Sequence, residues 1–269
     1  MTSKPPSRSA SPTPTDVLEA AVRGLRRGVV GVVRRYHRLE VIVDEPLPDQ
    51  PALLVANHGF GGIVDLNVFA IYGALDEAGV DRPVTPLVHR LAWLTGVGPI
   101  VEAAGGRPAS RESALTAFAE GNHVLVLPGG DLDAGKSWSK RNYIVFGGRR
   151  GFAKLAMEAG VPIVPVVTAG AGESLLVLSD GQSLAKTFRA DRFLRTKALP
   201  VSVSVPWGLN VGVVGILPYL PLPTKLVTRI LPAMWPAQGA SAAEYADAVQ
   251  HRMQQALTGM TKNRKLLRG

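Results

Sequence analysis

Hydrophobic and polar positions along the chain follow two periods, and this predicts strands interleaved with helices. Short continuous apolar runs, typical of buried strands, alternate with segments in which apolar residues recur at spacings of three and four. The predicted strands are Leu39–Val43, Ala52–Ala56, Val84–Val88, His123–Leu127, Ile163–Thr168 and Lys225–Leu231. The predicted helices are Leu66–Ala78, Ser110–Glu120, Gly151–Ala159 and Ser241–Leu257. This alternation indicates an α/β fold with a mainly parallel mixed sheet flanked by helices.

A basic amphipathic helix is predicted ahead of this domain, at residues 16–38, with Asp16 as its cap. Its apolar face would hold Leu18, Val22, Leu25, Val29, Val32 and Tyr36. Much of the remaining surface would hold Arg23, Arg26, Arg27, Arg34, Arg35 and Arg38. Such a helix is typical of membrane-surface or partner binding, and equally of a helix packed on its domain with solvated arginines.

A long segment near the C-terminus, residues 198–224, carries no charged side chain. It is long enough to span a bilayer, but five prolines interrupt it and valines alternate with serines in its first part. We therefore expect a strand followed by a loop that meets a membrane interface or covers a substrate.

Composition narrows the class of protein. The 269 residues suit one α/β domain with appendages, and the 46% of hydrophobic residues exclude a chain disordered throughout. The absence of cysteine excludes disulfides, thiolate metal sites and cysteine nucleophiles. Residues 1–15 are rich in Pro, Ser and Thr and lack the apolar run of a secretory signal, so they are predicted to be a disordered arm.

The net charge of +9 suggests an anionic partner, and its distribution suggests which one. Residues 1–38 carry eight basic and two acidic side chains, residues 261–269 carry four basic ones, and the body, residues 39–260, is close to neutral. We expect the helix and the basic tail to dock on an anionic membrane surface. Nothing beyond charge favours nucleic acid, which is not expected as a partner.

The first candidate for chemistry is His58, which directly follows a predicted buried strand, together with Asp65. Ligand chemistry in α/β sheets gathers at the carboxyl ends of strands. A histidine held by a carboxylate can take a proton from a hydroxyl group. The alternative is a surface histidine, with Asp65 merely capping the helix that begins at Leu66.

Two further loops contain suggestive patterns. Residues 130–137 match the phosphate-loop pattern GxxxxGK[ST], and residues 175–180 imitate the acidic strand of the same enzymes. No helical pattern follows Lys136, and Asp131 and Asp133 would bring negative charge to the phosphates, so a P-loop NTPase is kept only as an alternative. Residues 105–112 place arginines at a helix N-terminus, which is either a seat for an anionic group or an ordinary cap.

Together these segments resemble the lysophospholipid acyltransferase-like superfamily, the phospholipid and glycerol acyltransferases, from about Leu39 to Glu173. His58 and Asp65 resemble the catalytic pair of that family, with Asn57 preceding them. The second block is matched by residues 105–112, where an arginine contacts the acceptor head group. Arg111 is the first counterpart and Arg107 the alternative. LPGGD at 127–131 and VPIVP at 161–165 match the third and fourth blocks, within the characteristic run from 149 to 166.

The chain departs from the family pattern in two places. Six residues separate His58 from Asp65 where four are usual, a spacing similar to the branch near monoacylglycerol and diacylglycerol acyltransferases. Gly129, Gly130 and Asp131 stand where phosphate-handling relatives carry Glu-Gly-Thr-Arg. The absence of that arginine weakens the expectation of a phosphorylated acceptor such as lysophosphatidate and strengthens that of a neutral glyceride or another lipid alcohol, and the sequence leaves both open.

The resemblance implies a membrane-associated O-acyltransferase that uses acyl-CoA or acyl carrier protein as donor and needs no cofactor or metal. His58 would be the general base and Asp65 its orienting partner, while amides near Gly129–Gly130 would stabilise the oxyanion. Asn57, Arg107, Arg111 and Asp131 would complete the substrate site. We expect a peripheral protein on the cytoplasmic face of a membrane. A non-catalytic lipid-binding protein with the same fold is the alternative.

Overall fold

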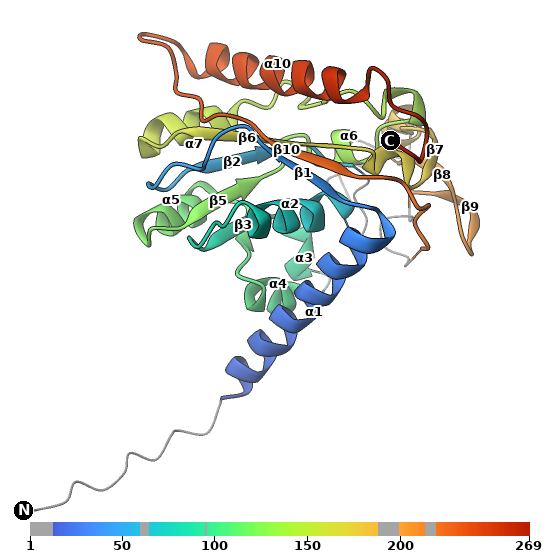
Figure 1. Ribbon diagram of the computed structural model, residues 1–269, viewed down its shortest axis with the longest axis horizontal. Coiled ribbons are helices and arrows are strands. Elements are labelled where there is room, and N and C mark those ends of the chain that lie inside the picture. The colour runs from blue at the N-terminus through green and yellow to red at the C-terminus, as the bar shows by residue number, and fades with distance from the viewer. Residues whose placement is uncertain (1–12, 60–64, 95, 188–198, 213–218) are drawn as a thin grey trace, which may run out of the picture.

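A seven-stranded mixed sheet forms the centre of the protein (Figure 1). The computed structural model describes residues 13–59, 65–94, 96–187, 199–212 and 219–269. In spatial order the strands are β1 (Glu40–Val43), β10 (Val227–Ile230), β6 (Ile163–Ala169), β2 (Leu53–Ala56), β5 (His123–Val126), β3 (Val84–Val88) and β4 (Arg107–Pro108). The last five are mutually parallel, whereas β10 pairs antiparallel with β6 and parallel with β1. The predicted fold class is confirmed.

Helices cover both faces of this sheet, as the alternation along β2 requires. Leu53 and Val55 belong to one apolar cluster, with α5 (Arg111–Ala119), α7 (Gly151–Ala159) and α10 (Ala242–Thr261). Ala52, Leu54 and Ala56 face the opposite cluster, with α2 (Leu66–Glu77). Since β2 is buried on both faces, its carboxyl end is a rigid platform for the residues that follow.

Helix boundaries follow local capping chemistry. Gly160 ends α7 in a left-handed conformation with φ of 63°, and Ser241 begins α10 with a capping box. The N-terminal helix α1 (Pro14–Tyr36) is capped by Thr13, whose side chain accepts from the Asp16 N–H. The predicted cap at Asp16 is therefore wrong by one turn, because Asp16 is the reciprocal partner of the capping box.

Several short elements have too few residues for a visible period, and the sequence did not predict them. They are α3 (Leu91–Leu94), α4 (Gly98–Ala103), α6 (Gly130–Ala134), α8 (Gln182–Thr187), and the 3₁₀ turns η1 (Trp138–Lys140) and η2 (Ala171–Glu173).

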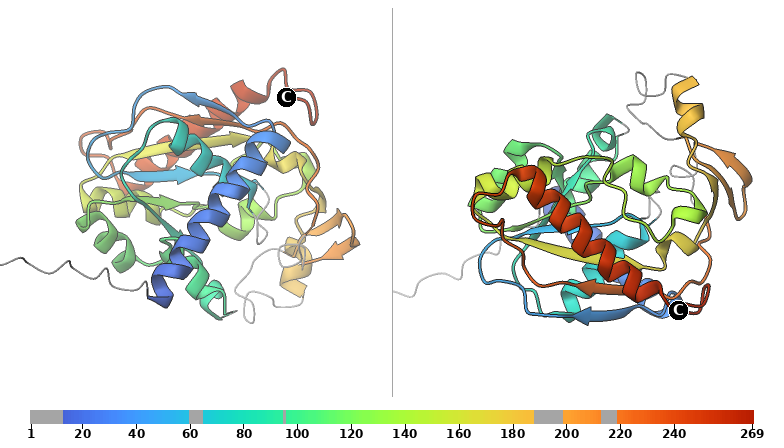
Figure 2. Two further views of the ribbon diagram at one scale, coloured as in Figure 1. Left: turned by 60° about the horizontal axis from the view of Figure 1, so that its bottom comes forward. Right: turned by 90° about the horizontal axis from the view of Figure 1, so that it is seen from above.

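A small antiparallel sheet stands beside the main one, visible at the right in both views of Figure 2. It consists of β7 (Leu176–Ser179), β8 (Val201–Ser204) and β9 (Gly208–Val211). The predicted strand in the uncharged segment is β8, and residues 213–218 of the predicted loop lie outside the described residues. In β8 the serines are buried while Val203 is 39% exposed, and its cross-strand neighbour Leu209 is 67% exposed. The outer face of this sheet is therefore apolar.

Helix α1 packs on the domain by only part of its length, and its first half projects from the body (Figure 1). Val30 and Val33 are buried, and the Arg26 guanidinium lies 4.7 Å from the ring centre of Tyr72 on α2. Leu25 and Val32 of the predicted apolar face remain 65% and 60% exposed. None of the described helices combines the length and the apolar character needed to cross a membrane. Residues 1–12, most of the predicted arm, lie outside the described residues.

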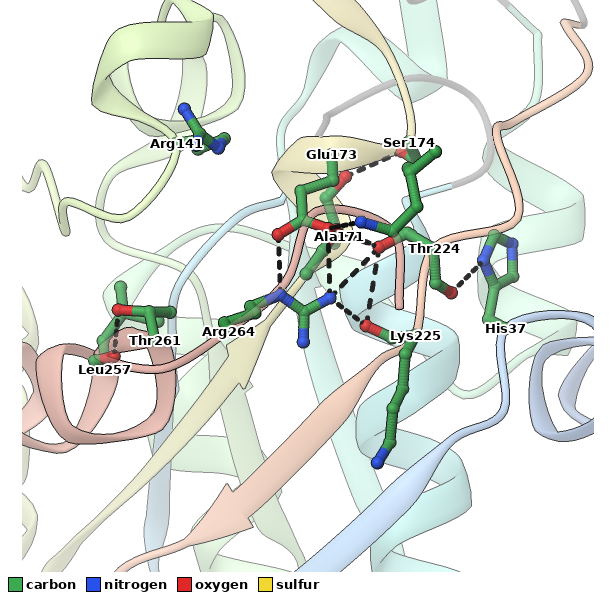
Figure 3. A network of polar contacts seen from close by, with 12 residues as sticks. His37, Arg141, Ala171, Glu173, Ser174, Thr224, Lys225, Leu257, Thr261 and Arg264 are labelled. Carbon is green, nitrogen blue, oxygen red and sulfur yellow. Dashed lines mark hydrogen bonds and ion pairs between the residues drawn. The ribbon is translucent and has the colours of Figure 1, made fainter. Parts of the chain in front are cut away.

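The C-terminal tail is bound to the body through a buried ion pair (Figure 3). Arg264 Nε donates to Glu173 Oε1 over 2.6 Å, and both side chains are almost fully buried. Glu173 also accepts from the Leu267 N–H at 2.8 Å and from the Thr224 hydroxyl at 3.1 Å. Because Arg264 is buried in this ion pair, the membrane contact predicted for the tail would have to be made by its other basic residues.

Candidate active site

His58 and Asp65 are brought together at the carboxyl end of β2. His58 Nδ1 lies 2.5 Å from Asp65 Oδ2. Asp65 is also the N-cap of α2, because its Oδ1 accepts from the Asn67 N–H at 2.8 Å. The two interpretations drawn from the sequence are therefore compatible, since one carboxylate oxygen caps the helix and the other holds the histidine. Residues 60–64, within the six-residue gap, lie outside the described residues.

The pairing determines which ring nitrogen can act as a base. An ionised carboxylate only accepts hydrogen bonds, so Nδ1 of His58 donates and Nε2 keeps its lone pair in the neutral ring. The side chains of His58 and Asp65 are 18% and 10% exposed. The pair is thus shielded from water while part of the imidazole remains accessible.

Asn57 fastens the start of this loop to the sheet. Its Nδ2 donates to the Thr168 carbonyl at 3.1 Å and its Oδ1 accepts from the Thr168 N–H at 2.9 Å. The Asn57 carbonyl accepts from Asn67 Nδ2 at 2.7 Å. Asn57 is only 3% exposed, so it is a positioning residue, in place of the substrate contact expected from the sequence.

Gly59 is required by close packing on the other side of His58. A Cβ at this position would lie 2.2 Å from Ala171 Cβ and 2.6 Å from Asn67 Oδ1. The loop after His58 therefore packs closely against Ala171, the first residue of η2.

A buried ion pair lies directly against the main chain of His58. Asp133 Oδ2 accepts from the His58 N–H at 2.6 Å, and Lys136 Nζ donates to the His58 carbonyl at 3.0 Å. Asp133 and Lys136 are themselves 2.7 Å apart and almost fully buried. These two residues were not predicted as part of the site; the only signal that pointed to them was their place in the phosphate-loop pattern.

The same geometry contradicts the P-loop alternative. The segment that would cradle phosphates forms the short helix α6, and Lys136 is only 5% exposed. A short 3₁₀ turn, η1, follows in place of the helix that a phosphate loop needs. Asp180 ends the segment 175–180 that imitates the acidic strand of phosphate-loop enzymes, and it pairs with Lys140 at 3.2 Å. The P-loop interpretation is therefore wrong.

The Gly129–Gly130 turn lies at the end of β5, the strand next to β2. A Cβ on Gly129 would lie 2.6 Å from the Val145 carbonyl, and Gly130 has φ of 48°. The Gly130 N–H donates to the Leu127 carbonyl at 3.2 Å, so it is engaged within the turn and does not support the predicted oxyanion role.

Arg149 binds this turn and pairs with the carboxylate of Asp131. It donates to the carbonyls of Pro128 and Gly129, and its Nη2 donates to Asp131 Oδ1 at 2.5 Å. Asp131 is thus part of a structural ion pair, and the turn carries no net charge.

The two candidate arginines do not meet at His58 in the described structure. Arg107 Nη2 donates to Glu120 Oε2 at 2.5 Å, and it lines a surface hollow of about 440 Å³ with Asn122. Glu120 and Asn122 precede the amino end of β5, whereas His58 follows the carboxyl end of the parallel strand β2, so they lie at opposite ends of the strands. Arg111 Nε donates to Glu158 Oε2 at 2.8 Å on α7. The role in head-group binding remains a prediction for Arg111, and the geometry does not bring Arg107 to the site.

Tyr219 is a further residue beside the site that the sequence analysis missed. Burial, together with the negative charge of Asp65, raises the pKa of Tyr219 well above its ordinary value. A single tyrosine in an uncharged segment gives no sequence signal. In the described part of the chain no cluster of three or more His, Asp or Glu side chains could hold a metal ion.

Comparisons with known proteins show what this chain is similar to. Residues 38–169 match the family model described as Acyltransferase. A chicken protein named "DGAT1/2-independent enzyme synthesizing storage lipids" is 29% identical over 160 residues, 59% of this chain and 47% of that protein. The human "Diacylglycerol O-acyltransferase 2-like protein 6" is 27% identical over 213 residues, 74% of this chain and 62% of that protein.

The chain spans roughly half the length of most curated relatives that it matches. Among solved structures, the 1-acyl-sn-glycerophosphate acyltransferase PlsC of Thermotoga maritima superposes with a TM-score of 0.54. It is 17% identical, and the match covers 91% of this chain and 84% of that one. At this identity the likeness shows the fold, a mixed sheet flanked by helices.

Proposed function

We propose that this protein, whose residues 38–169 match the family model described as Acyltransferase, moves a fatty acyl group from a thioester donor to a lipid hydroxyl. The donor is acyl-CoA or an acylated carrier protein. The observation that carries the proposal is the 2.5 Å contact of His58 Nδ1 with Asp65. That contact is what general-base catalysis on a hydroxyl needs, because it leaves Nε2 with the lone pair.

The reaction proceeds in balanced steps. His58 Nε2 takes the proton of the acceptor hydroxyl as its oxygen attacks the thioester carbonyl. Asp65 stabilises the imidazolium that forms. The tetrahedral intermediate then breaks its C–S bond, and the leaving thiolate takes the proton back from Nε2. The products are an ester and a free thiol, and the thioester itself supplies the activation, so no cofactor is needed.

The acceptor we propose is a neutral glyceride or a related lipid alcohol. Among the described residues, the Lys136 ammonium beside His58 is neutralised by Asp133, and Arg149 over the Gly129–Gly130 turn is neutralised by Asp131, so neither of these two cations is free to hold a phosphate. The similarity to a relative named for synthesising storage lipids supports the same acceptor class.

We place the enzyme on the cytoplasmic face of a membrane as a peripheral protein, with α1 as the docking element. Leu25 and Val32 form an exposed apolar stripe on this helix. Arg27 and Arg35 have no acidic partner among the described residues. An apolar stripe flanked by arginines matches an anionic bilayer surface, where each basic group contributes about 1 kcal/mol.

Membrane docking is tested by vesicle flotation with mixtures of neutral and anionic phospholipid. Leu25→Ser with Val32→Ser, and separately Arg27→Gln with Arg35→Gln, should each weaken binding, the second most visibly at low salt. Arg252→Gln on α10 serves as the control. Unchanged binding by both variants would contradict the docking role of α1.

The activity is tested by lipid extraction and mass spectrometry after incubation with a panel of hydroxyl acceptors and either acyl-CoA or an acylated carrier protein. His58→Ala should lose about 10²–10⁴-fold in turnover while staying folded. His251→Ala, which removes an exposed histidine of α10, should be fully active. Binding to lipid vesicles with no transfer to any acceptor, from either donor, would favour a lipid-binding protein without catalysis.

A further inference from the structure

The main chain of His58 is held at both of its polar groups by one buried ion pair. Asp133 accepts from the His58 N–H at 2.6 Å, and Lys136 donates to the His58 carbonyl at 3.0 Å. The two charged groups contact each other at 2.7 Å. Asp133 lies in the short helix α6 and Lys136 just after it, some 75 residues away in sequence and beyond the end of the neighbouring strand β5.

Every polar atom of this pair has a partner. Lys136 has three N–H donors, and they reach Asp133, the His58 carbonyl and the Tyr143 carbonyl, the last at 2.9 Å. Asp133 Oδ1 additionally accepts from the Val145 N–H at 3.0 Å. The side chains are 0% and 3% exposed. A buried network that is fully satisfied has one defined geometry, and it rigidifies whatever it holds.

Stability alone is a weak reason for such a pair. Removing two charges from water costs several kcal/mol, and replacing a buried ion pair by apolar residues is often neutral or stabilising. The position of the pair gives a better reason for its presence. The pair holds the main chain of His58, whose imidazole must point at the acceptor hydroxyl. A misplacement of about 1 Å in an active site can cost about 10²-fold in rate.

We propose that Asp133 and Lys136 are positioning residues that fix the His58 main chain and thereby aim Nε2, without touching the substrate themselves. This rests on the proposed role of His58 as the general base. Asn57 and Gly59 constrain the neighbouring residues, as described above, and the ion pair constrains His58 itself.

The test compares two buried ion pairs of the same molecule. Asp133→Asn keeps the size but turns an amide N–H₂ toward a main-chain N–H, and Asp133→Asn with Lys136→Met removes both charges together. The matched control, Glu173→Gln with Arg264→Met, removes an equally buried pair that does not contact His58. Turnover is measured per folded protein, at a temperature well below each variant's melting transition.

We expect the variants at 133 and 136 to lose about 10–100-fold in kcat, with KM for the acyl thioester changed less than about threefold. The control should keep its kcat even where its melting temperature falls. A folded Asp133→Asn variant with the kcat of the unmodified protein would overturn the proposal. So would an equal loss of kcat in the control pair, since that would indicate a general effect of buried charge.

A second readout does not depend on activity. Nuclear magnetic resonance detects the His58 Nδ1 proton, assigned by its loss in His58→Ala. We expect this signal to shift or broaden in Asp133→Asn and to stay unchanged in the control pair. An unchanged signal in Asp133→Asn would overturn the positioning role. If His58→Ala keeps its activity, the proposed function fails, and this signal alone then decides whether the ion pair orients His58.

Discussion

Replacing Asp65 by Asn separates its two roles with a single atom change. Oδ1 of Asp65 caps α2, while Oδ2 contacts His58 Nδ1. Asparagine is as good an N-cap as aspartate, so the cap survives. Its N–H₂ group then faces the imidazole, which must accept through Nδ1 and carry its proton on Nε2. The ring cannot act as a base in that form.

The two roles predict effects of different size. Loss of general-base catalysis lowers kcat by about 10²–10⁴-fold, which corresponds to about 3–5 kcal/mol of transition-state stabilisation. The stability of Asp65→Asn should change by only a few tenths of a kcal/mol. Asp65→Ala loses the cap as well, at about 1 kcal/mol or about 2–4 °C in melting temperature.

The assay follows the transfer of labelled acyl groups to lipid, alongside thermal unfolding by circular dichroism. We expect Asp65→Asn to be stable and nearly inactive, and Asp65→Ala to be both less stable and nearly inactive. If Asp65→Asn retains the turnover of the unmodified protein, Asp65 is only a helix cap and the proposed mechanism is refuted.

Three further changes test other parts of the structure. Burial, with Arg82 as a second cause, lowers the pKa of His123 to about 4, so the unfolded chain binds a proton that the folded one excludes. The free energy of unfolding should fall as pH drops from about 6.5 to about 4, and His123→Asn should remove about 3 kcal/mol of that fall in urea titrations. Glu173→Gln leaves Arg264 buried without its partner and should cost about 3–5 kcal/mol in the same titrations. Gly59→Ala introduces a Cβ that clashes with Ala171, and it should lower kcat at least about tenfold.

Each of these changes has a control or a contradicting result. An unaltered pH dependence in His123→Asn would show that this histidine is not held neutral by the fold. A Glu173→Gln variant as stable as the parent would mean that the tail is not fastened by this ion pair. For Gly59→Ala the control is Gly28→Ala on α1, where a Cβ meets nothing within 4 Å and full activity is expected.

The main sheet and its helices could be predicted because their signals are local. β2 reads as a continuous apolar run, and α7 ends at Gly160 as its pattern indicates. The buried face of α1 could not be predicted in the same way, because packing against the domain decides it. That packing buries Val30 and Val33 and leaves Leu25 and Val32 exposed to solvent. The serines of β8 point inward for the same reason, since neighbouring elements, not the alternation itself, decide which face is covered.

The candidate site was only partly accessible from the sequence. His58 and Asp65 could be named from their motif, although no spacing rule could say that a six-residue gap closes to 2.5 Å. The sequence could not exclude Arg107 from the site, because the direction of its side chain depends on the position of its partner Glu120 in the folded chain. Asp133 and Lys136 were read as part of a misleading pattern, since a contact between distant loops leaves no local signature.

The central claim is that His58 drives acyl transfer to a lipid hydroxyl, and one measurement tests it most directly. Purified protein and its His58→Ala variant are incubated with acyl-CoA and an equimolar mixture of diacylglycerol and lysophosphatidate, and the products are quantified by mass spectrometry. The account predicts triacylglycerol as the main product, dependent on His58. Equal product formation by the two proteins would contradict it.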